Sequence, residues 1–205
     1  MKTYESIGKE ILSGNSYVFD KLDGNNVRAE WTPKKGFWKF GSRTQLIDES
    51  DERFGKSILL MKEKEEENSR ILKDIYKNPQ EATFFFEFHG PNSFAGVHLK
   101  DDPIKVTLID VAIYKNGLVM PGDFIKYFVP KTDCAPLLYV GNVTQNVVES
   151  VRNRTLAGMT FEGVVCKQNR AKTHHPNRMF KIKSNDWIAK VKSLYTDEKI
   201  LKELL

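Results

Sequence analysis

Short strand-like segments recur along the whole chain, and helical patterns interrupt them at irregular intervals. Strands are predicted at 17–22, 27–32 and 37–41, and later in the runs ATFFFEFHG, KVTLIDVAIY, FVP, LLYVGNV, TFEGVVCK and MFKIKS. A regular alternation of strands and helices would favour a doubly wound parallel sheet. The irregular order instead favours an α+β fold with antiparallel sheets flanked by helices.

Four stretches carry the apolar spacing of amphipathic helices. These are residues 4–13, residues 51–77, which form one helix or two ended by an Asn-Pro pair, residues 142–157, and the tail 185–205. No linker rich in Gly, Ser or Pro divides the chain, so we expect a single domain over 1–205 that ends in a C-terminal helix.

The charge balance is basic, with 32 Lys and Arg against 27 Asp and Glu and a net charge of +5. This balance permits binding to nucleic acid or phosphates without establishing it. The two cysteines have no CxxC spacing, which favours a reducing compartment. There is no signal-peptide pattern and no apolar run of ~20 residues, so we expect a soluble, cytoplasmic protein with no membrane partner.

The run YVFDKLDGNNVRAEW at 17–31 places charged residues beside a tight turn. Strand patterns on both sides of 23–26 predict a β-hairpin. The hairpin does not explain why Lys21, Asp23 and Arg28 stand around one turn. A lysine amine has a free pKa of ~10.4 and attacks phosphorus only when its surroundings favour the neutral form.

The run FKIKS supplies two further lysines. On a strand, Lys181 and Lys183 point to one face, and Phe180 and Ile182 point to the other. Two lysines on one face are either a solvated strand edge or a clamp for an anion. In the second case their charges would also favour the neutral form of Lys21.

Two glutamates lie within strongly apolar runs, Glu87 in TFFFEFHG and Glu162 before GVVCK. Such residues are seldom buried without a partner. They form a structural ion pair or an edge position, or they bind a hard cation or sugar hydroxyls. Magnesium would suit a site that already contains lysines and phosphates.

In this order the motifs resemble those of the covalent nucleotidyltransferases, which comprise the ATP-dependent ligases and the capping enzymes. KLDGNNVR resembles motif I, FFFEFHG motif III, LIDVAI motif IIIa, EGVVCK motif IV and FKIKS motif V. GSRT at 41–44 is similar to the arginine element that follows motif I in RNA ligases. K-x-D-G alone is a weak signal, whereas five motifs in the family order are specific.

The resemblance implies a role for each matched position. Lys21 would be the nucleophile that forms a lysyl-AMP with ATP, and Lys181 and Lys183 would grip the α-phosphate and lower the pKa of Lys21. Glu162 would help to hold Mg²⁺ or Mn²⁺. The other matched residues would bind the nucleotide: Asp20 at the adenine edge, Asp23 and Gly24 in the turn, Arg28 and Arg43 at the ribose or at phosphates, including those of the nucleic acid, Glu87 at the ribose and Val165 at the purine.

The chain departs from the family pattern at motif IIIa. The family usually has an aromatic ring near the motif's aspartate, and that ring stacks on adenine. Here Ile109 precedes Asp110, so the stacking residue is not identified.

The resemblance implies an adenylyltransferase domain. DNA ligases and capping enzymes carry an OB-fold after motif V, whereas 22 residues follow Lys183 here, so we expect no OB-fold domain and a relationship to the RNA ligases. The implied activity transfers AMP to a nucleic acid 5′-phosphate and seals it to a 3′-hydroxyl, with RNA favoured over DNA and an accessory protein left open. The alternatives are a minimal DNA ligase, a capping enzyme that uses GTP, and a non-sealing domain that binds nucleotide or nucleic acid.

Two further segments leave alternatives open. His174 and His175 lie in the basic run NRAKTHHPNR, which is read as an exposed loop in preference to a metal site. The run WTPKKGFWKFG at 31–41 is read as a hairpin core with solvated lysines in preference to a platform for base stacking.

Overall fold

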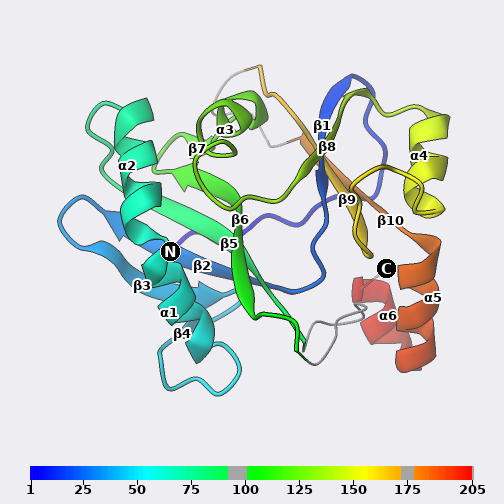
Figure 1. Ribbon diagram of the computed structural model, residues 1–205, viewed down its shortest axis with the longest axis horizontal. Coiled ribbons are helices and arrows are strands. Elements are labelled where there is room, and N and C mark those ends of the chain that lie inside the picture. Colours follow the sequence, from blue (N-terminus) through cyan, green and yellow to red (C-terminus); the bar gives the residue numbers. More distant parts are fainter. Residues whose placement is uncertain (92–100, 172–177, 205) are drawn as a thin grey trace.

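The computed structural model describes residues 1–91, 101–171 and 178–204, which form two antiparallel sheets with helices around them (Figure 1). The larger sheet contains, in order, β4 (Leu46–Ile47), β3 (Gly36–Ser42), β2 (Asn25–Thr32), β5 (Ala82–His89), β6 (Lys105–Ile113) and β7 (Gly117–Leu118). The smaller sheet contains β10 (Arg178–Lys183), β9 (Gly163–Gln168), β1 (Asn15–Asp20) and β8 (Leu137–Asn142). The expected α+β class with antiparallel sheets is therefore confirmed.

Six helices flank the sheets within the described residues, and Figure 1 shows their positions. They are α1 (Gly55–Glu63), α2 (Glu65–Ile75), α3 (Pro121–Tyr127), α4 (Gln145–Arg152), α5 (Asn185–Leu194) and α6 (Glu198–Leu204). The region 51–77 thus contains two helices, and the C-terminal tail contains two as well. Within the described residues, no helix combines the length and the apolar composition that crossing a bilayer requires.

Each sheet buries one face against helices and turns the other toward the cavity described below. In β2, the alternating residues Val27, Ala29 and Trp31 join Ile58 of α1 and Ile71 of α2 in the main core. In the smaller sheet, alternating apolar residues pack against α4; they include Val18, Val164, Cys166, Phe180 and Ile182. This alternation leaves the intervening polar side chains of both sheets free to face one another.

The structure corrects the expected hairpin at 23–26. β1 pairs with β8 and β9, whereas β2 pairs with β3 and β5, so the two strands lie in different sheets. Both edges of each strand are occupied by these partners, which leaves no edge on which β1 and β2 could pair. Residues 21–24 therefore form a crossing between the sheets.

Two other expectations were wrong. Residues 4–13 form no helix; the segment is extended, and Gly8 forms a parallel bridge with Phe180 of β10. The backbone bonds that a helix would keep within the segment go partly to β10, where Lys181 N–H donates to Gly8 C=O at 2.9 Å. The run FVP is not a strand but follows α3, a helix that begins at Pro121 and that the sequence did not indicate.

Gly24 is required by close approach of the crossing to β5. A Cβ at this position would lie 2.5 Å from the carbonyl oxygen of Phe88 and 2.9 Å from Cβ of His89.

We expect Gly24→Ala to destabilise the protein by about 1–3 kcal/mol, the usual cost of overpacking, measured as a lower thermal unfolding midpoint. Gly8→Ala is the control, since its Cβ would meet only the Met179 carbonyl at 3.5 Å. Equal midpoints for the two variants would contradict this account.

Candidate active site

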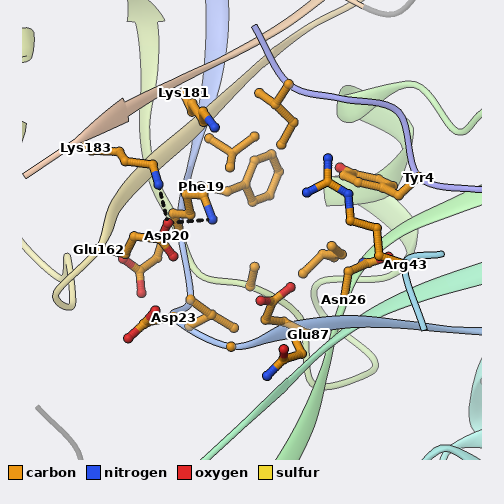
Figure 2. A pocket seen from close by; sticks show the side chains of 18 of the residues that line it. Tyr4, Phe19, Asp20, Asp23, Asn26, Arg43, Glu87, Glu162, Lys181 and Lys183 are labelled. Atoms are coloured by element: carbon orange, nitrogen blue, oxygen red, sulfur yellow. Dashed lines mark ion pairs between the residues drawn. The ribbon is translucent and has the colours of Figure 1, made fainter. Parts of the chain in front are cut away.

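A cavity of about 310 Å³ opens between the polar faces of the two sheets. All the predicted site residues except Arg28 line it: Asp20, Lys21, Asp23, Gly24, Arg43, Glu87, Glu162, Val165, Lys181 and Lys183. They come from the end of β1, the crossing, the turn after β3, the turn before β9, and β5, β9 and β10. Figure 2 shows most of these side chains converging on the cavity.

The backbone holds Lys21 at the end of β1. Its N–H donates to Gly163 C=O at 2.9 Å, and the N–H of Asp20 donates to Pro136 C=O at 2.8 Å. The crossing then turns at Gly24 against β5. The Lys21 amine is therefore presented from a short segment that is fixed at both ends.

One buried carboxylate joins the crossing to β10. Oε1 of Glu162 lies 2.9 Å from Nζ of Lys21 and 3.1 Å from Nζ of Lys183 (Figure 2). The Glu162 backbone is fixed as well, because its carbonyl accepts the Ser184 N–H at 2.9 Å. Lys181 and Lys183 face the cavity and Phe180 and Ile182 face α4, so the predicted strand alternation is confirmed.

The pKa of Lys21 is raised, which corrects the expectation that neighbouring lysines lower it. Burial pulls this pKa down, but the charges of Glu162, Glu87 and Asp23 and the hydrogen bond from Lys21 to Glu162 outweigh burial. The amine is therefore protonated at neutral pH in the structure. It becomes a nucleophile only if a bound substrate changes these interactions.

The pKa of Lys183 shifts in the opposite direction to that of Lys21. Burial, followed by the charges of Lys21 and Lys181, lowers the pKa of Lys183 to about 8, although Glu162 opposes the shift. Its Nζ lies 3.6 Å from the centre of the Trp187 ring and donates to the carbonyl of Leu204 in α6. Lys183 is thus fixed in position by three kinds of contact.

Trp187 lines the cavity, although the sequence analysis indicated only that its segment, residues 185–205, forms an amphipathic helix. Its indole N–H donates to Oδ1 of Asp23 at 3.3 Å, so α5 supports the crossing. A local feature of the sequence could have indicated that Trp187 lies near the site. Ser184 directly follows Lys183 and caps α5 by accepting the Trp187 N–H at 3.1 Å.

Glu87 faces the crossing from β5 (Figure 2). Burial and, to a lesser extent, the charges of Glu162 and Asp23 raise its pKa to about 8, against the opposing effect of Lys21. At neutral pH the group is therefore mostly a neutral carboxylic acid, which can donate a hydrogen bond as well as accept one.

The carboxylate of Asp20 is already bound. Oδ1 accepts the Thr160 N–H at 3.0 Å, and Oδ2 accepts the Thr160 hydroxyl at 2.8 Å. Asp20 lines the cavity, but these bonds tie it to the loop before β9. The structure thus gives it an anchoring role, and its contact with adenine stays a prediction.

Arg28 was misplaced by the sequence reading. It lies two residues further along β2 than Asn26, which does line the cavity. The N-terminal segment covers Arg28, whose guanidinium donates to the Lys2 carbonyl at 3.0 Å, and the amino group of Met1 pairs with Glu30 at 3.1 Å. The chain that crosses over β2 therefore separates Arg28 from the cavity.

A second buried ion pair ties the two sheets together beside the cavity. Nζ of Lys167 in β9 lies 2.7 Å from Oδ2 of Asp110 in β6 and donates to the Ile109 carbonyl at 2.6 Å. The hydroxyl of Tyr4 donates to the same Asp110 oxygen. Lys167 and Asp110 belong to two of the recognised motifs, but nothing in the sequence indicated that they pair.

The residues present fit a metal that binds mainly through substrate phosphates. Among the described residues, no three His, Cys, Asp or Glu side chains gather as a metal cage. Glu162 offers one carboxylate, and Mg²⁺ is commonly held by one or two carboxylates together with phosphate oxygens and water. His174 and His175 lie outside the described residues.

The segment 31–41 has the predicted hairpin core. Trp31, Phe37 and Phe40 are buried against α1 and α2. Trp38 is exposed, with Nζ of Lys35 4.1 Å from its ring centre.

The fold is that of the ATP-dependent RNA ligases. An archaeal ATP-dependent RNA ligase matches with a TM-score of 0.63 and 14% identity, over 93% of this chain and 50% of that chain. A Naegleria gruberi RNA ligase with PPi matches at 0.60 and 16%, and a mutant with ATP and Mn at 0.61 and 16%, each over 87% of this chain and 52% of that one. The chain thus spans about half the length of these ligases. Family models and curated proteins gave no match.

Neutralising Glu162 should lower the pKa of Lys21. In Glu162→Gln, burial still disfavours the charged amine, while its nearest carboxylate is gone. An NMR titration of labelled lysine side chains, without nucleotide or metal, measures the shift. Glu63→Gln, an exposed change on α1, should leave the Lys21 titration in place. An unchanged or higher pKa in Glu162→Gln would show that Glu162 does not keep Lys21 protonated.

Removing only one charge of the Lys167–Asp110 pair should lower the free energy of unfolding more than removing both charges. Lys167→Met leaves a buried, unpaired carboxylate, so we expect a loss of about 3–5 kcal/mol in unfolding free energy. Lys167→Met combined with Asp110→Asn removes both charges and should recover part of that loss. Denaturant unfolding of the single and double variants measures the coupling. A double variant less stable than Lys167→Met would contradict the pairing.

Proposed function

We propose that the chain is an ATP-dependent RNA ligase-like enzyme whose residues 1–205 act as one adenylyltransferase unit. The observation that supports this most is the placement of Lys21. Its amine stands at the crossing of two sheets and pairs with Glu162, which also binds Lys183, in a cavity that Glu87 and Lys181 also line. The fold shared with RNA ligases supports the same conclusion.

In the first step, Nζ of Lys21 attacks the α-phosphorus of ATP. A P–N bond forms, the bond between the α-phosphorus and the bridging oxygen breaks, and pyrophosphate leaves. Charge develops on the phosphoryl oxygens, so Lys181 and Lys183 stabilise the transition state from the facing strand. Positioning and charge stabilisation account for most of the rate enhancement in such reactions.

The amine must lose a proton before or during the attack. The Glu162 carboxylate already accepts a hydrogen bond from Nζ of Lys21 at 2.9 Å, so it is the nearest acceptor for that proton. Lys183 shares the same Glu162 oxygen and keeps it oriented toward the amine. When bound, Mg²⁺ or Mn²⁺ on Glu162 and the phosphate oxygens would supply charge neutralisation for the pyrophosphate that leaves.

Other cavity residues select the nucleotide. Val165 on β9 packs against the purine, and Ile109, which precedes Asp110, lines the same cavity. Glu87, mostly neutral near pH 7, hydrogen-bonds a ribose hydroxyl without placing another negative charge beside the phosphates. Asp20 and Asp23 hold the crossing in shape through Thr160 and Trp187.

The later steps act on nucleic acid. AMP passes from Lys21 to a strand's 5′-phosphate, and a 3′-hydroxyl then displaces AMP to form the phosphodiester. RNA is the proposed substrate because the solved structures compared above are RNA ligases. The net charge of +5 favours a polyanionic partner.

The proposal predicts covalent labelling at Lys21. With ATP radiolabelled at the α-phosphate and Mg²⁺ or Mn²⁺, the protein should carry label on a denaturing gel, and Lys21→Ala should lose it. Lys190→Ala, an exposed lysine on α5, should label as the unchanged protein does. Label that persists in Lys21→Ala would remove Lys21 as the nucleophile.

Sealing assays then separate the related activities. We expect joining of 5′-phosphorylated RNA ends and no label from GTP. Joining of nicked DNA alone would identify a DNA ligase, and label from GTP would indicate capping chemistry. Absence of label with every nucleotide would leave a domain that binds without sealing.

A further inference from the structure

Trp38 of β3 is exposed, although the other two tryptophans of the chain are buried. Its relative exposure is 41%, against 1% for Trp31 and 2% for Trp187. Trp38 neither lines the cavity nor belongs to the main core, so neither the fold nor the proposed chemistry accounts for it. Tryptophan is enriched where proteins meet their partners, because its large ring combines apolar area with a polar N–H group.

A bulge in β3 turns the Trp38 side chain out of the core. Phe37 and Phe40 are both buried in the main core, whereas regular alternation with period two would place them on opposite faces. The pairing with β2 shows how this happens. Glu30 lies opposite Lys39, and the next residue of β2 lies opposite Phe37, so Trp38 is an extra residue in β3. Bulges of this kind re-aim a side chain.

Two lysines surround the Trp38 ring. Nζ of Lys35 lies 4.1 Å from the ring centre, and Nζ of Lys39 lies 5.5 Å from it. Both distances are within the ~6 Å range of cation–π attraction. No carboxylate of the described residues lies within ion-pair distance of either lysine. The structure therefore presents an aromatic ring and two uncompensated positive charges together.

Lys39, whose Nζ reaches the Trp38 ring, lies on the face of the larger sheet that borders the cavity. By alternation along β2, Glu30 shares a face with Asn26, which lines the cavity, and Lys39 lies opposite Glu30. At the other end of β3, Arg43 follows the strand and lines the cavity (Figure 2). Five positions of mostly extended chain separate Trp38 from Arg43, a span of roughly 17 Å.

We propose that Trp38, Lys35 and Lys39 form a contact surface for a single-stranded RNA whose end lies in the cavity. The ring stacks on one unpaired base, and the two lysines contact neighbouring phosphates. Aromatic rings beside cations bind single strands with little dependence on sequence. The span between this surface and the cavity corresponds to about five stacked nucleotides at ~3.4 Å each. The inference rests on the proposed function, because this strand is the one that would receive AMP from Lys21.

Charge and base accessibility favour a single strand over the other occupants of such a surface. Two copies of the chain meeting here would bring their uncompensated lysines together, and like charges repel. In a duplex the bases are stacked on one another, whereas unpaired bases are open to an aromatic side chain. The surface therefore fits a polyanion with open bases.

Strand binding without ATP tests the surface apart from the reaction. Fluorescence anisotropy measures the affinity for a 5′-phosphorylated RNA of about 12 nucleotides, which exceeds the roughly five that span the gap. Trp38→Ala should weaken binding by about 5- to 100-fold, the usual effect of losing one base stack. Trp38→Phe keeps a ring and should keep most of the affinity. Lys35→Ala and Lys39→Ala should each lower the slope of log affinity against log salt by about 0.7.

Tryptophan fluorescence reports the stacking directly. Trp31 and Trp187 are buried, so a base that stacks on Trp38 should quench mainly the Trp38 emission. That quenching should be lost in Trp38→Phe and weakened with an RNA in which abasic sites replace some bases. Tyr114→Ala is the matched control and should leave the affinity unchanged. Tyr114 is 52% exposed, lies 5.3 Å from Nζ of Lys115 and follows β6, three strands away from β3.

Three outcomes would overturn the proposal. The first is that the unchanged protein does not bind the strand. The second is that Trp38→Ala leaves the affinity unchanged, or that Tyr114→Ala lowers it equally. The third is that Trp38→Ala alters the oligomeric state in sedimentation and not the RNA affinity, which would make the surface a contact between copies of the chain. Lys35 is exposed, so Lys35→Ala tests the surface even if Trp38→Ala fails to fold.

Failure of the surface is distinguishable from failure of the ligase function. If Lys21 takes label from ATP while Trp38→Ala binds RNA as the unchanged protein does, the surface is wrong and the ligase function stands. If strand binding depends on Trp38 in a protein that takes label from no nucleotide, the ligase function is wrong and the surface stands.

Discussion

The pairing of Glu162 with two lysines sets the chemical state of the whole cavity. Lys21 comes from the crossing and Lys183 from β10, and both Nζ atoms approach the same carboxylate oxygen. Burying two ammonium groups without this carboxylate would cost several kcal/mol each. The same contact keeps Lys21 protonated, so the stable arrangement is also an unreactive one. The amine can therefore act as a nucleophile only when a bound substrate changes these interactions.

The cavity exists because β1 and β2 belong to different sheets. Each strand is interior to its sheet, so the short connection between them must pass across the gap, and Lys21 lies in that connection. The ion pair between Lys167 of β9 and Asp110 of β6 also joins the two sheets, and the Tyr4 hydroxyl donates a hydrogen bond to the same carboxylate. Alternation along β5, β9 and β10 then directs every second side chain inward. The site is thus a property of how two sheets face one another.

What the sequence predicted well follows from local rules, and what it missed is non-local. Period-two alternation placed Lys181 and Lys183 opposite Phe180 and Ile182. Every site residue that the motifs indicated lines the cavity except Arg28. The turn at 23–26 read as a hairpin because turn residues between strand patterns do not reveal which sheet each strand joins. The pair of Lys167 and Asp110 spans 57 positions, and no local pattern encodes such a contact.

The N-terminal segment shows how a stretch without regular structure can complete a site. Residues 4–13 were expected to be helical because apolar side chains recur at helical spacing, yet the backbone is extended and bonds to β10 at Gly8. Placed there, the segment covers Arg28, supplies the Tyr4 hydroxyl to Asp110 and carries the charge of Lys9 toward Lys181. The two lysines of β10 that face the cavity therefore differ: Lys183 pairs with Glu162, whereas Lys181 makes no ion pair with a described residue and its pKa is lowered by burial and then by the charges of Lys21 and Lys9. An identical pair of residues on one strand acquires two electrostatic roles from the chain that packs beside it.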